Sequence, residues 1–63
     1  MKYEYYVIAF KNNRTGEIKE YYQFTSPEDI EDKAKDLKKR FFDIDEPITI
    51  LIYKQIKAIY DEE

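Results

Sequence analysis

The pattern of apolar and polar positions in the first part of the chain is typical of a β-hairpin. Residues 3–11 and 17–24 are rich in aromatic and β-branched side chains and are too short for a stable helix. The turn cluster 12–16 lies between them and holds the only glycine of the chain, which can take the positive φ that closes a hairpin. Pairing Lys11 with Glu17 would bring opposite charges together beside the turn. The pattern therefore predicts two antiparallel strands in this register.

The hydrophobic period changes to that of a helix over residues 27–42. The apolar positions recur at i, i+4, i+7 and i+11, on one helical face: Ile30, Ala34, Leu37 and Phe41. Ser26 is expected to cap the first turn, because Pro27 suits the first helical position. Acidic side chains crowd the first turns and basic side chains the last, which complements the helix dipole. We expect Phe41 to be the largest anchor of this helix in the core.

A β-branched run over residues 48–60 predicts a third strand, which makes the element order ββαβ. The crossover from the second strand through the helix to the third should be right-handed, with the first strand between them. This predicts an α+β fold of the split-βαβ type, in which one helix packs on one face of a three-stranded antiparallel sheet of order 2-1-3. A single small domain, residues 1–63, is expected, because so short a chain supports at most one core.

Strand alternation gives this sheet two different faces. Even-numbered positions are expected to face the helix, which in residues 17–24 places Ile18, Glu20, Tyr22 and Phe24 in the core. The odd-numbered positions should form the open face, whose large side chains are Tyr3, Tyr5, Val7, Tyr21, Leu51, Tyr53 and Ile59. An exposed apolar patch of several hundred Å² marks an interaction site, and tyrosine is enriched at protein interfaces. We therefore expect these seven side chains to form a protein interface, although tyrosines on an open face can also serve strand propensity alone.

The residue inventory argues against catalysis. Among the 63 residues, 14 are acidic and 11 basic, and there is no Cys or His, which excludes a thiolate nucleophile, an imidazole base and the usual zinc sites. The helical acids are interleaved with lysines, which is typical of solvated charges rather than of a catalytic carboxylate pair. Asp43, Asp45 and Glu46 share a loop, but the central glycine of a calcium loop is missing. We expect no enzyme activity, no cofactor and no metal site.

Charge and hydropathy also restrict the partners. A net charge of −3 disfavours a nucleic-acid partner that is held by phosphate contacts. No run approaches the roughly 18 apolar residues of a membrane span, and the start of the chain lacks the pattern of a signal peptide. We expect a cytoplasmic protein with no membrane partner. The strand 48–60 is long and lies at a sheet edge, which favours a homodimer through that edge, the odd face or both.

The sequence predicts a small, non-catalytic protein-binding module. Short acidic chains of this kind are, by association, typical of phage or mobile-element accessory proteins that inhibit or modulate a host or defence protein in the host cytoplasm. Three alternatives stay open at this point. They are a nucleic-acid-binding module that stacks bases on the aromatic face, a mimic of DNA built from surface acids, and a designed miniprotein without a biological role.

Overall fold

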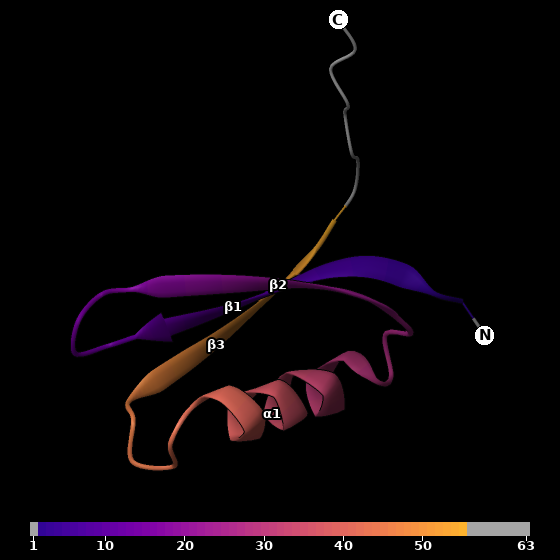
Figure 1. Cartoon of the computed structure of the whole chain (residues 1–63). Helices are drawn as coiled ribbons and strands as arrows, with labels where there is room; N and C mark the ends of the chain where they lie inside the picture. Colours follow the sequence, from indigo (N-terminus) through magenta and orange to yellow (C-terminus); the bar gives the residue numbers. More distant parts are fainter. Residues whose placement is uncertain (1, 56–63) are drawn as a thin grey trace, which may run out of the picture.

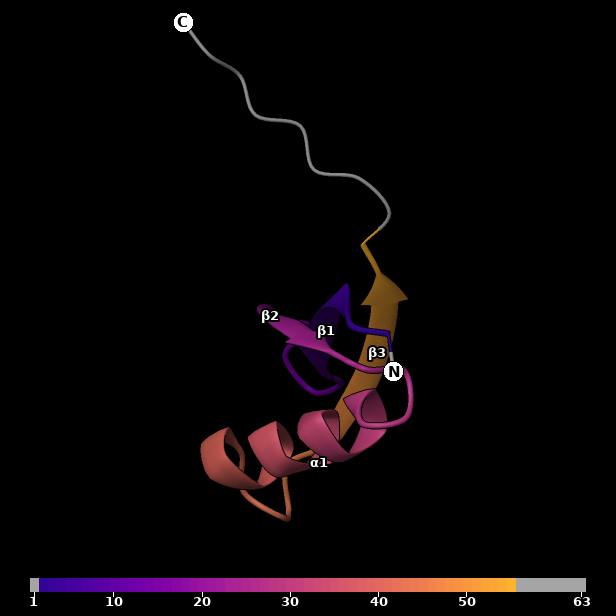
Figure 2. The ribbon, with the colours of Figure 1, turned by 90° about the vertical axis from the view of Figure 1, so that its right-hand side faces the viewer.

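A computed structural model of the chain describes residues 2–55, which form a ββαβ fold (Figure 1). Its elements are β1 (Glu4–Asn12), β2 (Ile18–Thr25), α1 (Ile30–Phe41) and β3 (Ile48–Lys54). β1 lies in the middle of the sheet and pairs antiparallel with both neighbours, so the strand order is β2-β1-β3. α1 covers one face of this sheet in both ribbon views (Figures 1 and 2). The predicted fold class, strand order and helix position are confirmed.

The hairpin register differs by one residue from the predicted one. Lys11 lies opposite Ile18, and Asn12 closes the loop through a 2.8 Å hydrogen bond from its N–H to the Glu17 carbonyl. The Asn12 side chain accepts hydrogen bonds from the backbone N–H groups of the two loop residues at positions 14 and 15. Gly16, with φ at 82°, completes this turn. The predicted Lys11–Glu17 pairing was wrong because Asn12 organises a shorter loop.

The helix begins three residues later than the predicted range. Ser26 does not cap it, because Ser26 opens a separate turn in which the Asp29 N–H donates to the Ser26 carbonyl at 3.1 Å. Asp29 is the residue that precedes α1, and its carboxylate accepts a 3.1 Å hydrogen bond from the buried Ser26 hydroxyl. The predicted capping role of Ser26 is therefore corrected: this hydroxyl links the two ends of the turn that leads into the helix.

The core lies between β1 and α1. Its buried members are Tyr6, Ile8, Phe10, Ile30 and Ala34. Phe41 was predicted to be the main helical anchor, but it stays 56% exposed and stacks on the Tyr21 ring at 5.4 Å. Phe42 packs against the Phe10 ring instead, at 5.1 Å, because its extended backbone (φ −134°, ψ 146°) ends the helix and turns its side chain inward.

The third strand is shorter than predicted within the described part of the chain. β3 ends at Lys54, and the next residue continues the pairing through a 2.8 Å hydrogen bond from the Gln55 N–H to the Tyr5 carbonyl. The remainder of the predicted strand, residues 56–60, lies outside the described residues. Within residues 2–55, no helix has the length and apolar character needed to cross a membrane.

Candidate functional site

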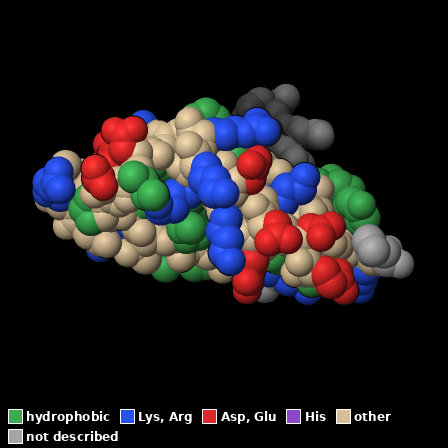
Figure 3. All heavy atoms as spheres, turned by 90° about the horizontal axis from the view of Figure 1, so that it is seen from below, with side chains coloured by type: hydrophobic (Ala, Val, Ile, Leu, Met, Phe, Trp, Pro, Cys, Tyr) green, Lys and Arg blue, Asp and Glu red, His purple; other side chains and the backbone are tan. Residues whose placement is uncertain are grey.

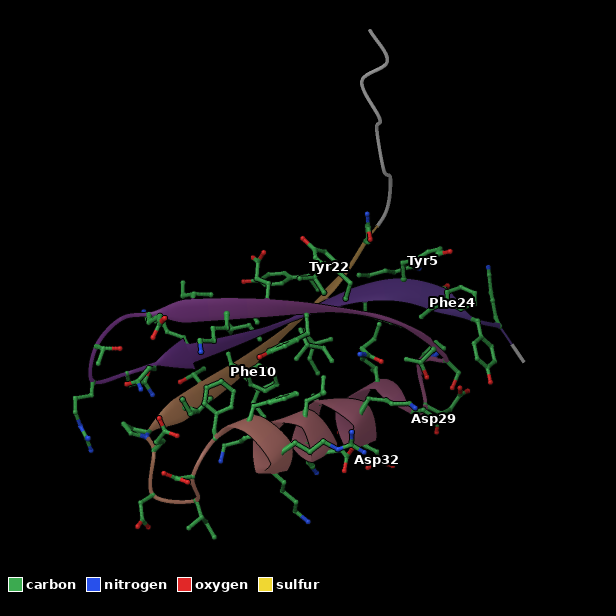
Figure 4. All side chains as sticks on the ribbon, viewed as in Figure 1. Tyr5, Phe10, Tyr22, Phe24, Asp29 and Asp32 are labelled. Atoms are coloured by element: carbon green, nitrogen blue, oxygen red, sulfur yellow. The ribbon has the colours of Figure 1, made fainter. Side chains whose placement is uncertain are left out.

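The sheet face opposite α1 carries a group of large side chains that we call the aromatic face. Its members are Tyr3, Tyr5, Val7, Ile18, Tyr22, Phe24, Leu51 and Tyr53. In the side-chain view, Tyr5 and Tyr22 project away from the helix, whereas Phe10 points toward it (Figure 4). No helix or strand of the described residues lies over this face (Figures 1 and 2). Among residues 2–55, the aromatic face is therefore the uncovered side of the sheet.

Strand pairing arranges the aromatic face in rows that run across the sheet. Val7 on the central strand lies between Tyr22 of β2 and Tyr53 of β3. One row further along, Tyr5 lies opposite Phe24, and the centroids of these two rings are 4.6 Å apart. Side chains directly opposite each other on antiparallel strands stabilise the sheet through such contacts. The rows therefore form one continuous surface and hold the aromatic rings in place on regular backbone.

The exposure of these side chains is high for their size. Six of them expose between 51% and 65% of their surface: Tyr3, Tyr5, Ile18, Tyr22, Phe24 and Tyr53. A large aromatic side chain has about 150–250 Å² of surface to bury, so the five aromatic members of this group expose on the order of 400–700 Å² together, to which Ile18 adds. A standard protein interface buries about 800 Å² on each partner. The aromatic face by itself approaches that size.

The structure places five of the seven predicted interface residues on this face. They are Tyr3, Tyr5, Val7, Leu51 and Tyr53. Tyr21 was assigned to the wrong face: it lies opposite Ile8, is half-buried and packs edge-on against Phe10 at 5.6 Å. Ile59 lies outside the described residues.

Three members of the aromatic face were missed by the sequence prediction, which put them in the core. They are Ile18, Tyr22 and Phe24, all on β2 and each more than half exposed. A shift of one residue in register moves a whole strand's side chains to the other face, so one error produced all three misplacements. The signal that could have found them is Asn12, whose side chain favours a turn that it closes itself.

Charge is sparse on the aromatic face. Among its strand residues only Lys11 and Glu20 are charged, and both lie toward the hairpin end of the sheet. Seen from the helix side, acidic and basic side chains are interspersed (Figure 3). The acidic side chains of α1 and of the turn before it are all exposed, as expected of solvated charges: Glu28, Asp29, Glu31, Asp32 and Asp36. The two sides of the molecule therefore differ in chemistry, one aromatic and one of mixed charge.

A small charged cluster lies at the start of β1, on the helix side of the sheet. The Lys54 ammonium lies 3.2 Å from Glu4 Oε1, and the Tyr6 hydroxyl donates to the same oxygen at 3.2 Å. The hydrogen bond from Lys54 lowers the pKa of the Glu4 carboxyl below its usual value. Burial raises the pKa of the Tyr6 phenol, which keeps it a neutral donor.

Glu4 should make folding sensitive to acid. Because its pKa is lower in the folded chain than the ordinary 4.5, its contribution is complete above that pH and is lost as the pH falls through the folded value. In Lys54→Met, we expect the Glu4 carboxyl to titrate closer to 4.5 in an NMR titration. The melting temperatures of parent and variant should then converge below the pH at which Glu4 is protonated. Titration of Glu4 at the same pH in both proteins would contradict this role for Lys54.

Within residues 2–55, no three acidic side chains are grouped closely enough to hold a metal ion, and this includes the loop with Asp43, Asp45 and Glu46. The chain was also compared with known proteins. A scan against protein-family models, a search of curated proteins and a search of solved structures find no match to it.

Proposed function

We propose that this chain is a small, non-catalytic module that binds another protein through the aromatic face. The observation that carries the proposal is the exposure of six large side chains, five of them aromatic, on one side of the sheet. Leaving so much apolar surface in water is unfavourable, and patches of this extent in folded proteins mark interaction sites. Tyrosine suits the role because its ring is buried by a partner while its hydroxyl can still reach water or a polar group.

A protein fits this face better than a nucleic acid does. A single-stranded nucleic acid needs stacking rings together with a basic track for its phosphates. Here the rings lie on the open face, whereas the basic cluster of the helix (Lys33, Lys35, Lys38, Lys39 and Arg40) belongs to the element on the opposite side of the sheet. The charged strand residues on the aromatic face, Lys11 and Glu20, offset each other. The arrangement therefore supports apolar contact with a protein surface.

The proposed biological setting rests on an association, namely that short acidic chains of this kind are typical of phage or mobile-element accessory proteins. With 63 residues and neither His nor Cys, it has few groups with which to alter a target covalently. Occupying a surface on the target requires only the aromatic face. We include in the proposal that the chain is an accessory protein of a phage or mobile element, and that it inhibits or modulates a host or defence protein in the host cytoplasm.

The test is a binding comparison between two variants of equal net charge. Tyr22→Glu with Tyr53→Glu places two carboxylates on the aromatic face, at side chains that are 65% and 54% exposed. Lys39→Glu on the exposed surface of α1 changes the net charge by the same amount. Parent and variants are immobilised and challenged with a lysate of a candidate host, and retained proteins are identified by mass spectrometry. We expect a protein that the parent and Lys39→Glu retain and the double variant does not.

Circular dichroism of both variants checks that each is folded, so that lost binding reflects the face itself. A protein retained equally by all three chains would show that binding uses another surface. Single-stranded DNA and RNA oligonucleotides provide the second arm of the test. If the parent binds them in a manner that weakens steeply with salt and depends on Tyr22 and Tyr53, the partner is a nucleic acid and the proposal is wrong.

A further inference from the structure

Within residues 2–55, β3 pairs with β1 on one side and with no strand on its outer edge. At the two ends of the β1–β3 ladder, the Gln55 N–H donates to the Tyr5 carbonyl and the Asn13 N–H donates to the Pro47 carbonyl. In an antiparallel ladder the residues that bond to one neighbour alternate with those that point away from it. Odd-numbered residues of β3 therefore bond to β1. The N–H and C=O groups that point outward belong to Ile48, Ile50, Ile52 and Lys54.

A groove runs between this edge and α1. It has a volume of about 190 Å³ and is lined by Glu31, Ala34, Lys35, Ile50 and Ile52. Ile52 remains 36% exposed although it lies on the helix side of the sheet, because it borders this open groove between β3 and α1. Proteins protect an apolar edge with proline, a bulge or charged side chains, and here Pro47 and Lys54 lie at the two ends of the edge, so that Ile48–Tyr53 between them carries neither proline nor charge. The edge, with its unpaired backbone groups, and the groove, with its exposed apolar side chains, together form a second surface for contact that is separate from the aromatic face.

The charges of two side chains on the rim of the groove, Glu31 and Lys35, favour a second copy of the chain as its partner. Glu31 and Lys35 are one helical turn apart and opposite in charge, and both line the groove. The two ion pairs within residues 2–55 are Asp36–Arg40 and Glu4–Lys54, so neither rim residue is engaged in one. A two-fold axis at this edge places Glu31 of one copy near Lys35 of the other, and the reverse. The rim is therefore complementary to itself.

We propose that β3 pairs with β3 of a second copy of this chain across a two-fold axis. In the symmetric register centred on Leu51, Ile50 lies opposite Ile52 of the second copy, and the outward N–H and C=O groups of both strands are satisfied. Ile50 and Ile52 of each copy then pack against Ile52 and Ile50 of the other on the helix side, beside the two grooves. At the rim of each groove, Glu31 of one copy forms an ion pair with Lys35 of the other. The product is a six-stranded sheet of order 2-1-3-3-1-2.

The dimer has a consequence for the aromatic face, although it does not depend on that face binding anything. A two-fold axis perpendicular to the sheet keeps both helices on one side and both aromatic faces on the other. The two faces then lie next to each other on one continuous sheet. A target with two matching sites, or a single broad one, would bind both copies with an avidity that neither copy has alone.

Charge reversal across the rim tests the pairing. The parent should sediment at twice its 7.8 kDa mass at about 100 μM, a concentration at which a dissociation constant of about 10 μM or below gives mostly dimer. Glu31→Lys alone sets lysines against lysines, and Lys35→Glu alone sets acids against acids. Each single variant should dimerise about tenfold more weakly than the parent. The double variant Glu31→Lys with Lys35→Glu restores opposite charges and should dimerise as the parent does.

Amide hydrogen exchange tests the strand pairing directly. In the monomer at low concentration, the outward amides of Ile50 and Ile52 should exchange quickly while those of Leu51 and Tyr53, bonded to β1, stay protected. Raising the concentration should protect Ile50 and Ile52 as well. The same concentration dependence should vanish in Ile52→Pro, which removes one outward N–H without removing a bond to β1.

Three results would overturn the proposal. The first is a parent that stays monomeric at about 100 μM, where any dimer with a dissociation constant of about 10 μM would be seen. The second is a dimer that none of the rim variants weakens. The third is a dimer that Tyr22→Glu with Tyr53→Glu abolishes and Ile52→Pro leaves intact, which would place the contact on the aromatic face. If Tyr22→Glu with Tyr53→Glu abolishes target binding but keeps the dimer, the result supports both proposals: the target binds the aromatic face, and the dimer forms through the β3 edge.

Discussion

Phe10→Ala is expected to lower the free energy of unfolding by about 3–5 kcal/mol, the usual cost of truncating a buried aromatic side chain. Phe10 is 1% exposed and joins the sheet to the segment after the helix, because its ring contacts both Tyr21 and Phe42. A domain of this length is stabilised by only about 5 kcal/mol in total. The variant should therefore be largely unfolded at about 37 °C, as measured by urea denaturation and by thermal melting.

Phe41→Ala is the matched control for this prediction. The Phe41 ring is 56% exposed and stacks on Tyr21 at 5.4 Å, so its removal should cost about 1 kcal/mol, the size of one aromatic pair. The contrast distinguishes the structure from the sequence prediction, which made Phe41 the main anchor. Equal losses for Phe10 and Phe41, or a larger loss for Phe41, would mean that the helix packs with a different face toward the sheet.

The second large effect tests the register of β2. Tyr21→Ala should lower the free energy of unfolding by about 2–3 kcal/mol, because it removes a half-buried ring that packs against both Phe10 and Phe41. The neighbouring change, Tyr22→Ala, should lower the free energy of unfolding by less than about 1 kcal/mol. Tyr22 is 65% exposed, and the contacts removed are those with its cross-strand neighbours.

The two tyrosine variants are measured by urea denaturation under identical conditions, and each is also assayed for target binding. We expect the two variants to have opposite effects. Tyr21→Ala should lose stability, whereas Tyr22→Ala should remain folded and lose target binding. If Tyr22→Ala were instead the more destabilised protein, the even-numbered residues of β2 would face the helix. The register would then be the one that pairs Lys11 with Glu17, and Tyr22 would leave the aromatic face.

These predictions differ from those of the sequence alone because the more apolar side of β2 is not its buried side. The even positions hold Ile18, Tyr22 and Phe24, whereas Tyr21 is the one large apolar side chain at the odd positions, so hydrophobicity favours burial of the even set, which the structure leaves exposed. β3 is not ambiguous, because Ile48, Ile50 and Ile52 share one parity, and the structure places all three on the helix side as predicted. A period of two shows that a strand has two different faces, but in an edge strand such as β2 the register with β1 decides which of them is buried.

Local sequence determined the elements of this protein, their order and the class of the fold. Aromatic and β-branched runs specify strands and the Ile30–Leu37 stripe specifies a helix, because these preferences act over a few residues. Chain direction and the handedness of the crossover then restrict the strand order. The existence of an aromatic open face also follows from sequence, since a single helix covers one side of a sheet.

Tertiary structure decided which residues occupy that face and where the helix is anchored. The loop closed by Asn12 set the register, and this transferred Tyr22 and Phe24 to the aromatic face and Tyr21 to the core side. The end of the helix turned Phe42, rather than Phe41, toward Phe10. Each outcome depends on the geometry of one turn, and a displacement of a single residue reverses the side on which a strand side chain lies. Hydrophobic pattern alone does not carry that information.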